Sequence, residues 1–240
     1  DTFENIEPQT IGTTFLTEKF ALSSANRSSL WNQRRPFLAY WGNVEAPKYL
    51  QVRFLHDDYD FSSATFHSQQ NENNVLAGIN FIANGADKHI SLDPLEDGKF
   101  KAKDLRIRFE FGNVKTPDDL KLPSSKYEPF SMIIDKLKFE FQMYFAEFDG
   151  LNGYWEKGGN ERANWIDFVF YSGNEKDFDL INISKAVSGF TFSINTADKN
   201  QVMEKAVVSE KDGNMNVIWK GLKIQVPVKP FFVKNVFDIR

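Results

Sequence analysis

Hydrophobic and polar residues alternate along many short stretches of the chain. The clearest stretch covers residues 138–145, where every second position is apolar: Phe139, Phe141, Met143 and Phe145. The same alternation recurs at 51–54, 106–111, 166–170 and 222–226. Because successive side chains of a strand point to opposite faces, this period of two predicts antiparallel strands with one buried face. Shorter apolar runs at 75–82, 205–209 and 231–237 predict further strands.

Helical periodicity is nearly missing, since almost no segment keeps apolar residues at i, i+3, i+4 and i+7 beyond one or two turns. About a dozen strands without helices between them predict an all-β fold, a large antiparallel β-sandwich of two packed sheets. Asp97-Gly98 and Asp212-Gly213 are typical of hairpin turns. The 24 phenylalanines fit this fold, because flat rings fill the gap of about 10 Å between two sheets. We expect these to be largely buried: Phe54, Phe109, Phe111, Phe139, Phe141, Phe145, Phe168 and Phe170.

Two stretches interrupt the alternation and predict long loops. One lies near 114–130 and contains three prolines, and the other lies near 149–162 and contains four glycines. Strands of the same phenylalanine-rich kind are predicted on both sides of the first stretch. We therefore interpret residues 1–240 as a single β-sandwich domain with two excursions.

Charge and composition exclude some classes of partner. The chain carries 29 Lys and Arg against 33 Asp and Glu, a net charge of −4, which disfavours binding to nucleic acid. No apolar run reaches the roughly twenty residues of a membrane-spanning helix. Cysteine is absent, so disulfides and thiolate chemistry are excluded. The chain begins at Asp1 without a leader-like segment, so we expect either a processed mature protein or an excised piece of a longer one. The expected location is secreted, periplasmic or at the cell surface.

Histidines beside carboxylates are the first candidate chemistry: His56, His67 and His89. A histidine pair with an aspartate could bind Zn²⁺, and a histidine near Tyr59 could form an acid–base pair. Their spacing matches no metal motif, which favours the alternative that such a histidine hydrogen-bonds an aspartate in a turn. The aspartates at 57, 58 and 60 resemble a Ca²⁺ loop but lack its glycine and its later glutamate. We predict no metal and no cofactor.

Sequence motifs of common hydrolases, zinc proteases and nucleotide-binding proteins do not occur. A pair of carboxylates for glycoside hydrolysis remains open, since 33 acidic residues are available and spacing alone selects none.

Tryptophan, tyrosine and arginine gather at two places and form the second candidate site. Planar guanidinium and aromatic groups beside amides are suited to gripping sugar rings and carboxylates. The alternative is that the tryptophans pack in the core and the arginines are solvated neighbours. Our candidate glycan-binding residues come from the segment 26–42 and from the predicted loop at 149–162: Trp31, Arg34, Arg35, Trp41, Tyr154 and Trp155.

The runs at 26–42, 49–61, 89–93 and 104–110 together resemble a known family. They are similar to the β-sandwich region that follows a helical toroid in heparinase-like and alginate-lyase-like polysaccharide-degrading proteins. In that family the toroid supplies most of the cleft and usually a catalytic tyrosine. This chain has no predicted toroid, so the resemblance implies a β-sandwich and a polysaccharide partner, and we carry over no catalytic residue.

These observations lead to one hypothesis and two alternatives. We expect a β-sandwich that recognises a polysaccharide or oligosaccharide, as an accessory domain or partner of a polysaccharide-degrading enzyme, with a helical domain or another protein chain as a further partner. One alternative is a complete β-sandwich polysaccharide lyase or glycoside hydrolase. The other is a non-catalytic structural or interaction module.

Overall fold

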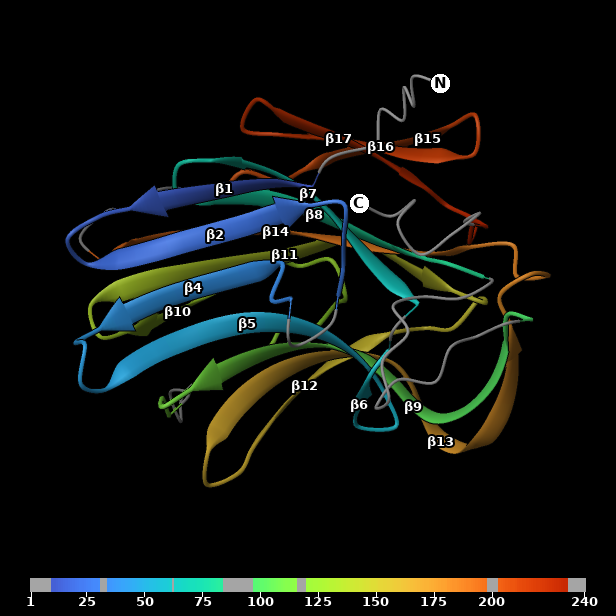
Figure 1. Ribbon diagram of the computed structural model, residues 1–240, viewed down its shortest axis with the longest axis horizontal. Coiled ribbons are helices and arrows are strands. Elements are labelled where there is room, and N and C mark those ends of the chain that lie inside the picture. Colours follow the sequence, from blue (N-terminus) through green and yellow to red (C-terminus); the bar gives the residue numbers. More distant parts are fainter. Residues whose placement is uncertain are drawn as a thin grey trace, which may run out of the picture.

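The computed structural model describes residues 10–30, 34–61, 63–83, 97–115, 120–197 and 203–232. These residues form seventeen strands in three antiparallel sheets and no helix. Figure 1 shows two large sheets stacked as layers, with the smallest sheet at the top of the view. The all-β sandwich expected from the alternation is confirmed. Within the described residues, no helix could cross a membrane.

The larger layer is an eight-stranded sheet with the order β1-β2-β4-β5-β9-β13-β12, and β6 pairs with β5. Its strands are β1 (Ile11–Leu16), β2 (Phe20–Asn26), β4 (Phe37–Gly42), β5 (Pro47–His56), β6 (Tyr59–Asp60), β9 (Lys99–Gly112), β12 (Tyr154–Gly159) and β13 (Ala163–Asp179).

The second layer is a six-stranded sheet with the order β10-β11-β14-β8-β7-β3. Its strands are β3 (Ser28–Ser29), β7 (Ala64–Asn71), β8 (Asn74–Phe81), β10 (Phe130–Ile134), β11 (Leu137–Phe148) and β14 (Ala186–Thr196).

A third sheet covers part of the outer face of this second layer. It consists of β15 (Val207–Lys211), β16 (Asn214–Trp219) and β17 (Leu222–Pro227). Strand β17 packs on β7 and β8, where Gly78 leaves room for the side chain of Val226. The structure therefore has more strands than the dozen expected and one sheet more than two. Period-two alternation identifies a buried face but not the sheet that buries it, so the third sheet was not visible in the pattern.

The core between the two large sheets is built mainly from phenylalanine. Rings from both layers meet there; Phe130 and Phe141, for example, stack with centroids 5.2 Å apart and planes at 15°. The predicted buried residues are confirmed with one exception: Phe54, Phe109, Phe111, Phe139, Phe141, Phe168 and Phe170 lie in this core.

The exception is Phe145, which leaves the core face of β11. The pairing of β11 with β14 shifts register between Met143 and Phe145, and this bulge turns the following side chain outward. Phe145 is partly buried against the cluster beneath the third sheet.

The segment 149–162 also differs from the predicted long loop, because β12 occupies its middle. Two of its four glycines lie in this strand, and a side-chain carbon at Gly158 would collide with the indole of Trp165 on β13. By contrast, the described residues from 113 to 115 and from 120 to 129 contain no strand.

Candidate functional site

Charged side chains form a band across the outer face of the eight-stranded sheet. On β9, alternation buries Ile107, Phe109 and Phe111 in the core, so the residues between them point outward. Neighbouring strands add charges beside them. We call the following residues the charged band: Arg53, Asp60, Asp104, Arg106, Arg108, Glu110, Glu156 and Asp167.

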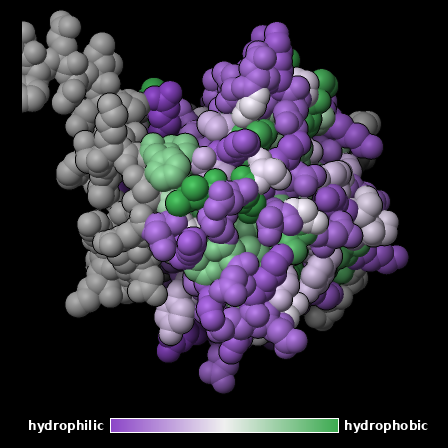
Figure 2. Space-filling view, turned by 90° about the vertical axis from the view of Figure 1, so that its right-hand side faces the viewer, coloured by the Kyte–Doolittle hydropathy of each residue, from purple (hydrophilic) through white to green (hydrophobic). Residues whose placement is uncertain are grey.

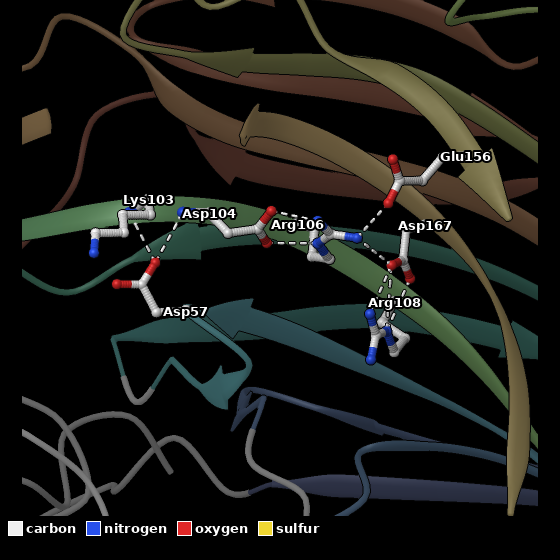
Figure 3. Close-up of polar contacts among 7 residues, drawn as sticks. All are labelled: Asp57, Lys103, Asp104, Arg106, Arg108, Glu156 and Asp167. Carbon is white, nitrogen blue, oxygen red and sulfur yellow. Dashed lines mark hydrogen bonds and ion pairs between the residues drawn. The ribbon is translucent and has the colours of Figure 1, made fainter. Parts of the chain in front are cut away.

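Strand register places like charges opposite one another in this band. Glu156 lies opposite Asp167, and Arg108 lies opposite Arg53. Directly opposed like charges destabilise a sheet. Here the diagonal neighbour Arg106 offsets the repulsion, since its Nη1 donates to Glu156 Oε1 at 2.6 Å and to Asp167 Oδ2 at 2.7 Å (Figure 3). The band therefore consists of two networks, one around Asp167 and Arg106 and one around Arg53.

Asp167 is the centre of the first of these networks. Its side chain is fully buried and also accepts from Arg108, with Nη2 2.8 Å from Oδ2. Arg106 is held on its other side by Asp104, and the hydrogen bonds that it donates to that carboxylate raise the pKa of Arg106 in spite of its partial burial. Two guanidiniums thus enclose Asp167, which keeps no open side for chemistry.

The most accessible part of the band surrounds Tyr154 on β12. Tyr154 is 48% exposed as a residue, and the neighbouring Glu156 side chain is 39% exposed. Partial burial raises the pKa of Tyr154, and the charges of Glu156 and Asp104 raise it further while Arg106 opposes them. We call Asp104, Arg106, Tyr154 and Glu156 the Tyr154 corner. It presents an open aromatic ring among carboxylate and guanidinium groups.

Aromatic and amide side chains continue the polar surface on the neighbouring strands. The Arg108 guanidinium lies 4.0 Å from the ring centre of Trp165, a cation–π contact. Glu110 accepts from Gln51 at 2.7 Å and from Arg53 at 3.2 Å, and Tyr49 donates to it at 3.4 Å.

The candidate glycan-binding residues are divided between the two faces of this sheet. Tyr154 lies on the outer face, and the exposed Arg35 donates to the hydroxyl of Tyr40 at 3.3 Å. Tyr40 and Tyr154 are separated by four strand spacings, which places them at least about 19 Å apart. Arg34 is partly exposed in the turn before β4, and Trp31 lies outside the described residues.

Trp41 and Trp155 point to the other face, into the core. Trp41 donates from Nε1 to Asp135 Oδ2 at 3.0 Å, and Trp155 donates to the Lys126 carbonyl at 3.2 Å. Packing therefore accounts for both indoles, and a glycan role for them stays a prediction.

The histidine candidates lie apart. His56 Nε2 is 2.7 Å from the Lys101 carbonyl, and Asp57 Oδ1 accepts from the amides of Lys103 and Asp104 (Figure 3). The hydrogen-bond partner of His56 is thus a backbone carbonyl and not the aspartate expected in the alternative, since Asp57 Oδ2 lies 3.7 Å from its Nε2. His67 lies on the other sheet, and His89 is outside the described residues. Among described residues, no three His, Asp or Glu side chains are grouped to hold a metal.

Sequence reasoning missed Arg106, Arg108, Glu156 and Asp167 as site residues. Their signal was present, because Arg106, Arg108 and Glu110 are the polar members of the alternation at 106–111. The sequence alone did not tell which acidic residues of β12 and β13 stand beside them.

Comparisons with known proteins give a distant structural similarity. No protein-family model and no curated protein matches the chain. A solved structure of a heparinase III gene product with methylated lysines matches at 12% identity and a TM-score of 0.37. The match covers 92% of this chain and 42% of that one, so this chain spans less than half of its length.

Proposed function

We propose that this protein is a carbohydrate-binding β-sandwich whose Tyr154 corner binds a neutral polysaccharide, as an accessory unit of polysaccharide breakdown. The observation that carries the proposal is the half-exposed ring of Tyr154 beside Glu156, Arg106 and Asp104. An aromatic ring can stack on the apolar face of a sugar, while carboxylates accept hydrogen bonds from its hydroxyls and guanidiniums donate hydrogen bonds to them.

The charge of the band favours a neutral polymer over an acidic one. Its eight residues carry five carboxylates and three guanidiniums. An excess of negative charge repels a polyuronate but does not affect the approach of a neutral glucan.

The network also makes the surface rigid before a ligand arrives. Arg106 is fixed by Asp104, Glu156 and Asp167 together. A side chain that is already ordered loses little further entropy on binding, so its contacts contribute more fully to affinity.

Affinity electrophoresis in gels containing soluble neutral glucans tests the proposal. Tyr154→Ala is expected to weaken retention about tenfold, because the stacking platform is lost, and to leave the melting temperature unchanged. Tyr59→Ala is the matched control, since Tyr59 is 73% exposed on β6, four strands away from β12.

The neighbouring residue gives the opposite expectation. Trp155→Ala removes a side chain that is 9% exposed and is expected to lower the free energy of unfolding by about 3–5 kcal/mol. If Tyr154→Ala binds every glucan as tightly as the parent, the Tyr154 corner is not the site. Retention by polyuronates alone contradicts the charge argument, and release of reducing ends or of an unsaturated product would indicate a complete enzyme instead.

A further inference from the structure

A polar cavity of about 630 Å³ lies on the opposite side of the molecule from the charged band. It is formed where the outer face of the six-stranded sheet meets the third sheet. We call it the amide pocket and define it by Arg27, Thr65, His67, Asn80, Lys223 and Gln225. Its volume is in the range of sites for small organic ligands.

Asn80 on β8 is a buried polar group of this pocket without a full set of partners. Its side chain is fully buried, and its Oδ1 accepts from the Thr65 hydroxyl and lies 2.9 Å from His67 Nε2. Its Nδ2 has no hydrogen-bond partner among the described residues. A buried amide donor left unpaired is costly, so the pocket holds a donor that a ligand oxygen would satisfy.

The His67 side chain in this pocket is uncharged at pH 7. Burial lowers the pKa of His67, and the positive charge of Arg27 lowers it further, against the hydrogen bond with Asn80. A neutral imidazole beside an amide and a hydroxyl suits hydroxyl groups, which both donate and accept.

The charges at the pocket have one sign. Arg27 and Lys223 are its two charged residues, and no carboxylate is among the described residues that line it. Two cations beside a group of amides and hydroxyls match a ligand that carries a carboxylate as well as hydroxyls.

From this arrangement we propose that the amide pocket binds a small hydroxylated carboxylate of the sugar-acid class. The carboxylate lies toward Arg27 and Lys223, and a hydroxyl or carboxylate oxygen accepts from Asn80 Nδ2. The proposal does not depend on the Tyr154 corner, because the two sites lie on different sheets and have opposite charge.

Isothermal titration calorimetry with glucuronate tests the pocket. Glucose lacks the charge and acetate lacks the hydroxyls, and each is expected to bind at least about tenfold more weakly than glucuronate. Lys223→Gln is expected to weaken glucuronate about tenfold without changing the melting temperature, because Lys223 is exposed. Lys211→Gln, an exposed lysine of the same small sheet outside the pocket, is the matched control.

A second variant probes the unpaired amide itself. Asn80→Asp replaces the Nδ2 donor by a carboxylate oxygen and is expected to abolish glucuronate binding, with melting temperature as the check of folding. If this variant does not fold, Lys223→Gln still decides. Equal affinity for glucose, phosphate as tight as glucuronate, no glucuronate binding by the parent, or unchanged affinity in Lys223→Gln would each overturn the proposal.

Discussion

The outer faces of the two large sheets arise from the same alternation but carry different kinds of polar side chain. On the eight-stranded sheet, eight charged residues pair with one another in the charged band. On the six-stranded sheet, the polar side chains at the amide pocket are neutral amides, hydroxyls and a histidine, with two cations beside them. The view in Figure 2 shows hydrophilic side chains over most of one side of the molecule, with hydrophobic ones in patches between them.

The difference shows which buried polar groups a fold can leave without a hydrogen-bond or ion-pair partner. A charge that is largely buried and unpaired costs too much to persist, so Asp167 is fully matched by Arg106 and Arg108. A neutral amide costs less, and Asn80 Nδ2 remains unpaired. The charged band is therefore complete within the chain, whereas the amide pocket has a donor to offer.

Among variants that compare the two outer faces, Asp167→Ala is expected to cause the largest loss of stability. Removing this buried carboxylate leaves two guanidiniums without their shared partner, and the free energy of unfolding should fall by about 3–5 kcal/mol in urea denaturation. Glu156→Gln, at the exposed end of the same network, should cost less than about 1 kcal/mol. Equal losses for the two variants would show that the network has no buried centre.

Asn80→Leu should have an intermediate effect. The change keeps a similar volume but removes the acceptor for Thr65 and His67, so we expect a loss of about 1–2 kcal/mol in the same urea denaturation. A loss as large as that of Asp167→Ala would contradict the distinction between charged and neutral polar groups.

The smallest effect is a dependence of stability on pH from His67. Because the folded protein lowers the pKa of His67 below its value of 6.5, the unfolded chain takes up the proton first as the pH falls. Stability should therefore decrease as the pH falls below about 6.5 and should level off below the folded pKa. In His67→Gln this part of the decrease should disappear from a comparison of melts at pH 7 and pH 5. If the parent instead became more stable between pH 7 and pH 5, and His67→Gln abolished that increase, the predicted direction of the pH dependence would be contradicted.

The sequence predicts which side chains of a strand are buried, but not which residues of other strands lie beside them. Alternation at 106–111 and 138–143 correctly separated core phenylalanines from outward polar residues, because the period of a strand is local. Strand register is not local. The pairing of β13 with β9 places Asp167 opposite Arg108, and a bulge in β11 turns Phe145 away from the core. The glycine-rich segment can form β12 because its glycines leave room for Trp165 of the neighbouring strand.

The candidate site shows the same limit. Aromatic character in a predicted loop makes Tyr154 a candidate, and the structure places it on the outer face of a strand beside Glu156. The same criterion selects Trp155, whose side chain points inward. In a loop the two neighbours have no assigned faces, while in a strand they must point to opposite sides.

The position of β14 has a consequence for how the protein is made in the cell. This strand, Ala186–Thr196, lies between β8 and β11, and all but its last residue are buried. During synthesis β8 and β11 emerge earlier, so both expose open hydrogen-bonding edges until β14 arrives. The nascent chain must therefore be protected from aggregation until Thr196 has left the ribosome, and its release into a folded state is expected to be slow.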